Sequence, residues 1–242
     1  MSTLPTLVLV HGAWHGTWCW QPLIEHLPDL DIRTVALPSS GQDPAALGGL
    51  YDDAEAVAHT ITDIDGPTVI LGHSYGGSPI TEAAATTGNV QRLIYLTALM
   101  QDTGDSVLSL AGGVYPPYWD VHHDPHGHTG HGYFQATQPT EILYHDVEPH
   151  LAQQAATQLA RQSLTSVTQP HTHAAWRTIP STYILCEHDQ AIPPPLQQAM
   201  ATHAQHTIRL QSGHSPFLSQ PAKLAHTLRH ELDPQPPHHT QQ

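Results

Sequence analysis

The residues best suited to chemistry form the hexapeptide Gly-His-Ser-Tyr-Gly-Gly, from Gly72 to Gly77. It follows the apolar run Thr68–Leu71 and opens an Ala-rich stretch of helical character. A G-x-S-x-G pattern between a strand and a helix is typical of a serine nucleophile on a sharp turn, where glycines let strand and helix approach closely. We therefore predict Ser74 as the nucleophile and the backbone N–H of Tyr75 as a donor to an oxyanion. The competing interpretation is an incidental serine in a glycine-rich turn.

A second glycine-rich loop, His11–Gly16, follows the first apolar run, Thr6–Val10. In open α/β sheets, ligands bind beside the loops at the carboxyl ends of the strands. The N–H of Ala13 is therefore a candidate second donor to an oxyanion, and Trp14 is a candidate for the wall of a substrate pocket. A simple connection between a strand and a helix is the alternative interpretation of this loop.

A serine nucleophile needs a base, and position selects one histidine from the 22 in the chain. His214 follows the apolar run Thr207–Leu210 and precedes the last helical pattern. In α/β folds with a serine nucleophile on a strand-to-helix turn, the order along the chain is nucleophile, acid, histidine. We therefore predict His214 as the general base. His73, beside the nucleophile, is predicted to be structural.

The carboxylate that orients this histidine is predicted to follow an earlier strand. Asp189 lies in the segment Glu-His-Asp-Gln-Ala-Ile-Pro after the run Thr182–Cys186 and is the preferred candidate. Glu187 is closer to the run and is a competitor, and Asp102 and Asp105, which follow the preceding run, are further alternatives. A loop carboxylate that caps the next helix is the structural interpretation of Asp189.

Six short, β-branched runs are predicted to be the strands that position these residues. They are continuously apolar rather than alternating, which suits parallel strands buried on both faces. Helical patterns separate them, so the chain is predicted to form an α/β domain with a mostly parallel sheet flanked by helices. The predicted strands are Thr6–Val10, Ile32–Leu37, Thr68–Leu71, Leu93–Leu96, Thr182–Cys186 and Thr207–Leu210, and the predicted helices are Tyr51–Ile64, Gly76–Thr86 and Pro216–Leu232.

One long segment interrupts this alternation of strands and helices. Residues 100–180 are far more than an ordinary connection between two strands needs, and Glu148–Leu164 has a helical pattern of its own. We predict that residues 1–99 and 181–233 form the core and that residues 100–180 form an inserted, mainly helical cap. The Pro-, His- and Gln-rich tail, residues 234–242, is predicted to be disordered.

Several side chains in and near the insertion are candidates for the substrate pocket. Tyr115, Tyr118 and Trp119 are expected to cover the substrate channel, and Thr97 and Leu99, at the end of a strand, are weaker candidates for its wall. Histidines also crowd one stretch, His122–His131. Their spacing matches no standard zinc pattern and the stretch is rich in Gly and Pro, so a solvated loop is predicted there and no metal is expected.

The composition excludes several classes of protein. The formal net charge of −14 argues against nucleic acid and against an anionic membrane surface as partners. No apolar run approaches the roughly 20 residues of a membrane span, and the N-terminal segment lacks the features of a signal peptide. We therefore expect a cytoplasmic protein. Cys19 and Cys186 are predicted to be buried free thiols, and no oligomeric state is predicted.

Taken together, the motifs resemble those of α/β-hydrolases of the small esterase group that includes plant methylesterases, hydroxynitrile lyases and bacterial carboxylesterases or pyrethroid-type hydrolases. The resemblance covers the chain from Thr6 to about Leu232. It implies an α/β-hydrolase fold, a catalytic triad and an oxyanion hole. The motifs that carry it are His11–Trp20, Gly72–Gly77, Glu187–Pro193 and Gly213–Phe217, and the residues it implies are Ser74, His214 and Asp189 for the triad and the N–H groups of Ala13 and Tyr75 for the oxyanion hole.

Departures from the family patterns narrow the expected chemistry. Hydroxynitrile lyases of this group carry Thr after the first-strand His and Lys after the catalytic His, whereas this chain has Gly12 and Ser215 there and its only lysine is Lys223. Epoxide hydrolases and haloalkane dehalogenases use an Asp nucleophile, whereas this chain has Ser74. Lyase, epoxide hydrolase and dehalogenase activities are therefore disfavoured.

The leading hypothesis is a serine esterase that hydrolyses small to medium apolar carboxylic esters through an acyl-enzyme on Ser74. The expected partner is a small-molecule ester, and no cofactor is expected. A C–C bond hydrolase or a cyclase or lactone-forming enzyme could use the same triad, and a small-molecule receptor without turnover is a further alternative. Because the base must be unprotonated, we expect the activity to fall below about pH 6.

Overall fold

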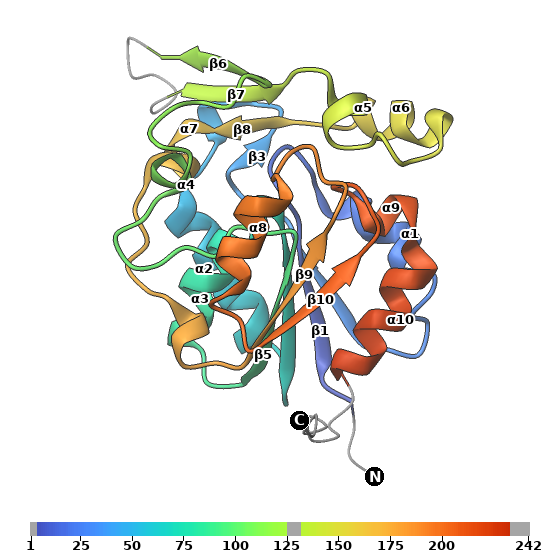
Figure 1. Cartoon of the computed structure of the whole chain (residues 1–242). Coiled ribbons are helices and arrows are strands. Elements are labelled where there is room, and N and C mark those ends of the chain that lie inside the picture. Colours follow the sequence, from blue (N-terminus) through green and yellow to red (C-terminus); the bar gives the residue numbers. More distant parts are fainter. Residues whose placement is uncertain (1–3, 125–131, 233–242) are drawn as a thin grey trace.

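The core of the molecule is a six-stranded sheet in which all neighbouring strands run parallel (Figure 1). The computed structural model describes residues 4–124 and 132–232. The strand order is β10-β9-β5-β4-β1-β2, and each of the six strands predicted from sequence is present. Their bounds are Thr6–Val10 for β1, Ile32–Val35 for β2, Thr68–His73 for β4, Val90–Leu96 for β5, Ser181–Cys186 for β9 and His206–Leu210 for β10.

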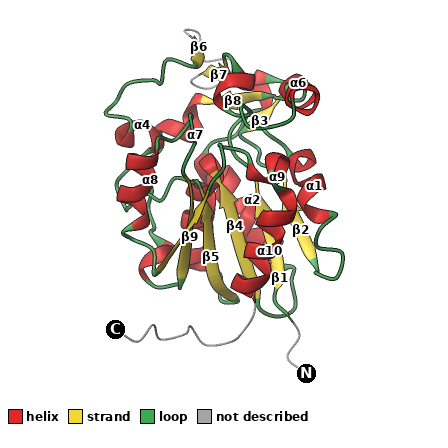
Figure 2. Cartoon of the chain, turned by 45° about the vertical axis from the view of Figure 1, so that its right-hand side comes forward, coloured by secondary structure: helices red, strands yellow, loops and turns green. Residues whose placement is uncertain are grey.

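Alternate residues of the central strands enter two separate apolar clusters, one on each face of the sheet. In β1, for example, Val8 and Val10 enter one cluster, whereas Leu7 and Leu9 enter the other. Helices cover both faces (Figure 2), which explains why these strands read as continuously apolar. The first face carries α2 (Leu50–Thr62), α3 (Gly77–Ala83) and α8 (Pro194–Ala201), and the second carries α1 (Gln21–Ile24), α9 (Pro216–Ser219) and α10 (Pro221–Leu232).

Because the strands are parallel, the segments that follow them meet at one edge of the sheet. That edge brings together the loop after β1, the turn after β4 and the loops after β5, β9 and β10. All the residues predicted for the triad and the oxyanion hole lie in these segments. Single 3-10 turns complete the described helices: η1 (Thr17–Trp20), η2 (Pro44–Ala46), η3 (Ser74–Gly76), η4 (Ala84–Thr86) and η5 (Ala175–Arg177).

The insertion lies above this edge and contains a second, antiparallel sheet of four strands (Figure 1). The sequence predicted a mainly helical cap and missed this sheet. One of its strands, β3, comes from the segment assigned to the core. The strands are β3 (Ser40–Gly41), β6 (Trp119–His123), β7 (Gly132–Ala136) and β8 (Arg161–Ser163), and the helices are α4 (Val107–Leu110), α5 (Pro139–Ile142), α6 (Pro149–Thr157) and α7 (Leu164–Thr168).

The helix predicted over Glu148–Leu164 is shorter in the structure, where α6 ends at Thr157. Residues that would have continued it form β8, which pairs with both β3 and β7. The N–H of Ala160 also donates to the carbonyl of Trp14 (2.7 Å). These contacts with distant parts of the chain replace the local helical hydrogen bonds, so helical periodicity alone could not locate the end of the helix.

The remaining sequence-based predictions concern the two cysteines, membrane-spanning helices, the C-terminal tail and the histidine cluster. Cys19 and Cys186 are both buried and unpaired, as predicted. Within residues 4–124 and 132–232, no helix is long and apolar enough to cross a membrane. The predicted tail, residues 234–242, and three members of the predicted histidine cluster, His126, His128 and His131, lie outside the described residues.

Candidate active site

Ser74 lies at the turn between β4 and α3 with a backbone φ of 52°, in the left-handed region that non-glycine residues rarely adopt. Glycines on both sides make this turn possible. A Cβ on Gly72 would lie 2.5 Å from the carbonyl oxygen of Gly76, and a Cβ on Gly76 would lie 2.6 Å from that of Val10. The pattern predicted from sequence therefore has the expected physical basis, since strand and helix approach too closely for any side chain at either glycine.

His214 follows β10 and forms a buried pair with Asp189, which follows β9. The imidazole Nδ1 lies 2.7 Å from the carboxylate Oδ2, and the two residues are 2% and 3% exposed. Nδ1 therefore carries the proton of this hydrogen bond, and Nε2 remains available as a base. The two predicted members of a triad are brought together across 25 residues of sequence.

Four further donors hold the Asp189 carboxylate. The backbone N–H groups of Ala191 and Ile192 donate to Oδ1 at 2.7 and 3.0 Å. The side chains of Gln197 (3.3 Å) and Thr97 donate to Oδ2. Sequence reasoning noted Thr97 only as a weak candidate for the pocket wall. Because β5 and β9 are neighbours in the sheet, the end of β5 carries Thr97 to the loop that holds Asp189.

The alternative acids point elsewhere. Glu187 pairs with Arg209 (3.0 Å). Asp102 pairs with Arg177, and Asp105 accepts a hydrogen bond from the N–H of Asp102 (3.3 Å). The geometry therefore favours Asp189 over all three as the partner of His214.

Three more histidines surround the site and are held neutral by burial. Burial lowers the pKa of His11 to about 4 and that of His15 to about 3. Burial, followed by the influence of His214, lowers the pKa of His73 well below its usual range. His73 Nε2 donates to the carbonyl of His214 (2.8 Å). This contact supports the prediction that His73 is structural, because it holds the loop that carries the base.

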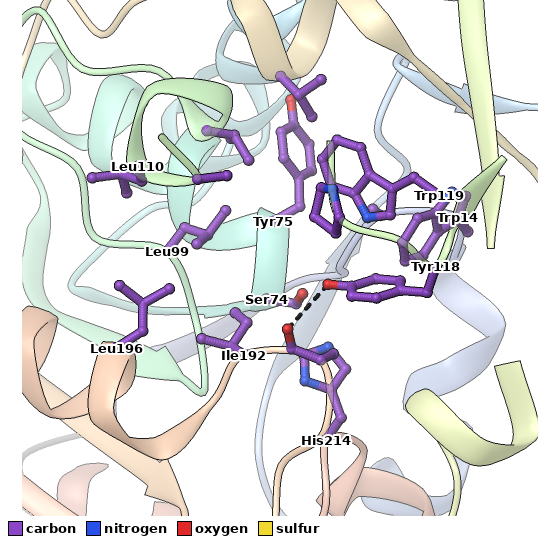
Figure 3. Close-up of a pocket in the computed structure, with 16 residues that line it drawn as sticks. Trp14, Ser74, Tyr75, Leu99, Leu110, Tyr118, Trp119, Ile192, Leu196 and His214 are labelled. Carbon is purple, nitrogen blue, oxygen red and sulfur yellow. Dashed lines mark hydrogen bonds between the residues drawn. The ribbon is translucent and has the colours of Figure 1, made fainter. Parts of the chain in front are cut away.

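A mainly apolar pocket with a cavity volume of about 100 Å³ opens above Ser74 and His214. Figure 3 shows the rings of Trp14, Tyr118 and Trp119 across the pocket from Leu99 and neighbouring aliphatic side chains. The complete lining is Ala13, Trp14, Ser74, Tyr75, Leu99, Val107, Leu110, Ala111, Pro116, Tyr118, Trp119, Val167, Ala191, Ile192, Leu196 and His214.

The structure thus places four of the predicted pocket residues, Trp14, Leu99, Tyr118 and Trp119, at the pocket wall. Tyr115 instead packs against Trp119 and His123, with ring centroids 6.1 and 6.0 Å apart. The hydroxyl of Tyr118 donates to the carbonyl of Ala191 (3.0 Å; Figure 3), which fixes its ring at the wall of the pocket.

The insertion fixes the loop that follows β1. Trp14 has a backbone φ of 63°, its N–H donates to Gln162 Oε1 (3.2 Å) and its indole N–H donates to the carbonyl of Phe134 (3.2 Å). Ala13, the predicted oxyanion donor, precedes Trp14 and lines the pocket together with Tyr75. Residues from the core and the insertion therefore build this wall together.

The described part of the histidine-rich stretch forms no metal site. Within the described residues, no group of three or more His, Cys, Asp or Glu side chains is placed to hold a metal ion. His122 lies 3.0 Å from the Asp120 carboxylate and stacks on Tyr133.

Comparison with known proteins agrees with this fold. The model of the alpha/beta hydrolase family matches residues 7–227, so the chain belongs to that family. It is 32% identical to the alpha/beta hydrolase nvfD of Aspergillus novofumigatus (93% of this chain, 95% of that protein). It is 26% identical to methylesterase 1 of Arabidopsis thaliana (90% and 92%). The structure of a pyrethroid hydrolase from Sphingobium faniae JZ-2 shares the fold, with a TM-score of 0.79 and 21% identity (96% and 98%).

Proposed function

We propose that the protein is a serine esterase that hydrolyses small to medium apolar carboxylic esters through an acyl-enzyme on Ser74. One observation carries the proposal. Ser74, on its strained turn, and His214, bonded through Nδ1 to Asp189, line the same apolar pocket. The methylesterase among the relatives supports the same class of reaction.

In the proposed reaction, Ser74 Oγ attacks the ester carbonyl while His214 Nε2 takes its proton. Asp189 holds the imidazole tautomer and stabilises the imidazolium that forms. The N–H groups of Ala13 and Tyr75 donate to the oxyanion of the tetrahedral intermediate. His214 then returns the proton to the leaving alcohol, and a water molecule, activated by the same imidazole, releases the acid.

The lining of the pocket supports an apolar substrate. Among the described residues that line it, none is Lys, Arg, Asp or Glu, and most are aliphatic or aromatic. A substrate with a strongly anionic group would lose its hydration there without gaining an ionic partner. We therefore expect the enzyme to discriminate against esters that carry a second carboxylate.

The first test replaces the nucleophile. We expect Ser74→Ala to lower the turnover of a p-nitrophenyl ester by at least a hundredfold and to abolish labelling by a fluorophosphonate, because the proposed acyl-enzyme forms on Ser74 Oγ. Ser78→Ala is the matched control, since Ser78 is a buried serine on the adjacent helix α3 that bonds to Gln101 rather than lining the pocket. It should retain both activities.

A panel of p-nitrophenyl esters of increasing acyl length then tests the substrate class. We expect ready turnover of the short and medium chains. Labelling of Ser74 without turnover of any ester would contradict the ester assignment and favour C–C hydrolysis or cyclisation by the same triad. Absence of both labelling and turnover would contradict the whole mechanism.

A further inference from the structure

A buried carboxyl group that the proposed mechanism does not use lies on α2. Asp53 is 0% exposed, and its Oδ2 accepts hydrogen bonds from the hydroxyls of Tyr75 (2.6 Å) and Ser39 (2.5 Å). Its Oδ1 accepts the N–H of Ser39 (2.8 Å). Within the described part of the chain, no Lys, Arg or His forms an ion pair with it. A buried carboxyl group without a cationic partner is costly, so its neighbours are informative.

The hydrogen bonds of Asp53 continue into the insertion. The Nε2 of Gln162, on β8, donates to the hydroxyls of Ser39 (2.7 Å) and Ser166 (2.9 Å). Its Oε1 accepts the N–H of Trp14 (3.2 Å). The directions of these hydrogen bonds are mutually consistent, because the Ser39 hydroxyl accepts from Gln162 and donates to Asp53. Ser39, Asp53, Gln162 and Ser166 are all fully buried.

The two ends of this network lie beside the two predicted oxyanion donors. One end is the side chain of Tyr75, whose own N–H is one donor, and the other is the N–H of Trp14, which directly follows the second donor, Ala13. Both ends adjoin residues with left-handed backbone, Ser74 (φ 52°) and Trp14 (φ 63°). Such conformations persist only where the surrounding structure holds them in place.

We propose that Asp53 is a positioning residue, which together with Ser39 and Gln162 ties the Tyr75 segment to the Trp14 segment and so sets the spacing of the two oxyanion donors. This inference rests on the proposed function. A donor acts on an oxyanion only within a narrow range of distance, so a small displacement of either segment weakens transition-state binding more than substrate binding. The network therefore affects kcat rather than KM.

The test compares two buried tyrosines. Tyr75→Phe removes the hydroxyl that binds Asp53 and leaves the backbone donor in place. Tyr95→Phe is the matched control, because Tyr95 is also fully buried and its hydroxyl bonds to Thr81 (2.7 Å), on helix α3, outside the network. We expect Tyr75→Phe to lower kcat by about tenfold with KM within twofold of wild type. Tyr95→Phe should leave both within twofold.

Two further measurements separate positioning from a general loss of structure. The rate of fluorophosphonate labelling of Ser74 should fall in Tyr75→Phe in parallel with kcat, since the phosphonyl oxygen occupies the same site. Gln162→Met opens the network at its other end and should lower kcat in the same way. Because both substitutions interrupt one network, the double variant should lose much less than the product of the two single losses.

The outcomes are distinct from those of the proposed function. If the wild type hydrolyses esters but Tyr75→Phe keeps its kcat, or Tyr95→Phe loses as much, the positioning role is overturned. Multiplicative losses in the double variant would also overturn it. If the wild type shows neither turnover nor labelling, the proposed function itself fails. If Tyr75→Phe does not fold, Gln162→Met alone is used. A lower kcat with KM near wild type then supports the positioning role, and an unchanged kcat overturns it.

Discussion

The loop after β9 and the start of α2 each hold a buried carboxyl group, and the two differ in the partners they receive. Asp189 accepts five hydrogen bonds, one of them from the imidazole of His214, which gains a proton during the proposed reaction. Asp53 accepts three, all from uncharged groups. Burial raises the pKa of Asp53 to about 7, although the hydrogen bonds from Ser39 and Tyr75 act in the opposite direction.

The comparison shows two uses of a buried carboxylate near one site. In the proposed reaction, the charge of Asp189 has a partner that becomes cationic, so it would contribute electrostatically to the transition state. Asp53 has no such partner, so the contribution that we propose for it is the geometry of the groups that converge on it. The predictions below test this difference, beginning with the largest expected effect.

Removing the charge of Asp189 should be far more damaging than any change at Asp53. We expect Asp189→Asn to lower kcat by about 10⁴-fold, because the amide no longer fixes the imidazole tautomer or stabilises the imidazolium. The measurement is ester turnover at saturating substrate. Glu187→Gln is the control, since Glu187 pairs with Arg209 rather than with His214, and it should stay near wild type. A loss below a hundredfold in Asp189→Asn would remove Asp189 from the triad.

The different positions of Asp189 and Asp53 in the fold explain why the sequence predicted a role in the site for the first and none for the second. Asp189 and His214 follow strands of a parallel sheet, so chain order alone brings them to one edge, together with Ser74 and Ala13. Asp53 lies on a helix, where the sequence suggests only a favourable interaction with the helix dipole. Its neighbour Asp52 has that role, since its carboxylate accepts the N–H of Gly49 (2.6 Å), whereas Asp53 turns inward.

The insertion was less predictable for a related reason. Its sheet joins short strands that are distant in sequence, and β8 has only three residues. The partner of Gln162 in the network, Ser39, lies 123 residues away. Buried polar residues of this kind carry no periodic signal, because their burial depends on hydrogen bonds that form only in the folded chain.

Stability should respond to the proton of Asp53. The pKa of Asp53 is raised from 3.8 to about 7. Between pH 4 and 7 the folded state therefore still holds a proton that the unfolded state has lost. The free energy of unfolding of the wild type should therefore fall over that range relative to Asp53→Asn, by about 4 kcal/mol in total. Urea unfolding at intervals from pH 4 to 8 measures the difference.

Above about pH 8 the difference between wild type and Asp53→Asn should become constant, because both states of the wild type are then ionised at this position. Tyr95→Phe serves as the control, since it removes a buried hydrogen bond without removing a carboxyl group. Its effect on the free energy of unfolding should be the same at every pH in the series. A difference for Asp53→Asn that is likewise independent of pH would contradict the raised pKa.

The smallest effect is expected where one donor of several is removed from Asp189. Thr97→Val keeps the shape of the side chain at a residue whose backbone φ is 37°, but deletes the hydroxyl that donates to Oδ2. The carboxylate keeps His214, two backbone N–H groups and Gln197. We therefore expect kcat to fall less than tenfold and the free energy of unfolding to fall by about 1 kcal/mol. A loss of kcat greater than a hundredfold would contradict this expectation, because it would show that the function of Asp189 depends on the position set by a single neutral donor.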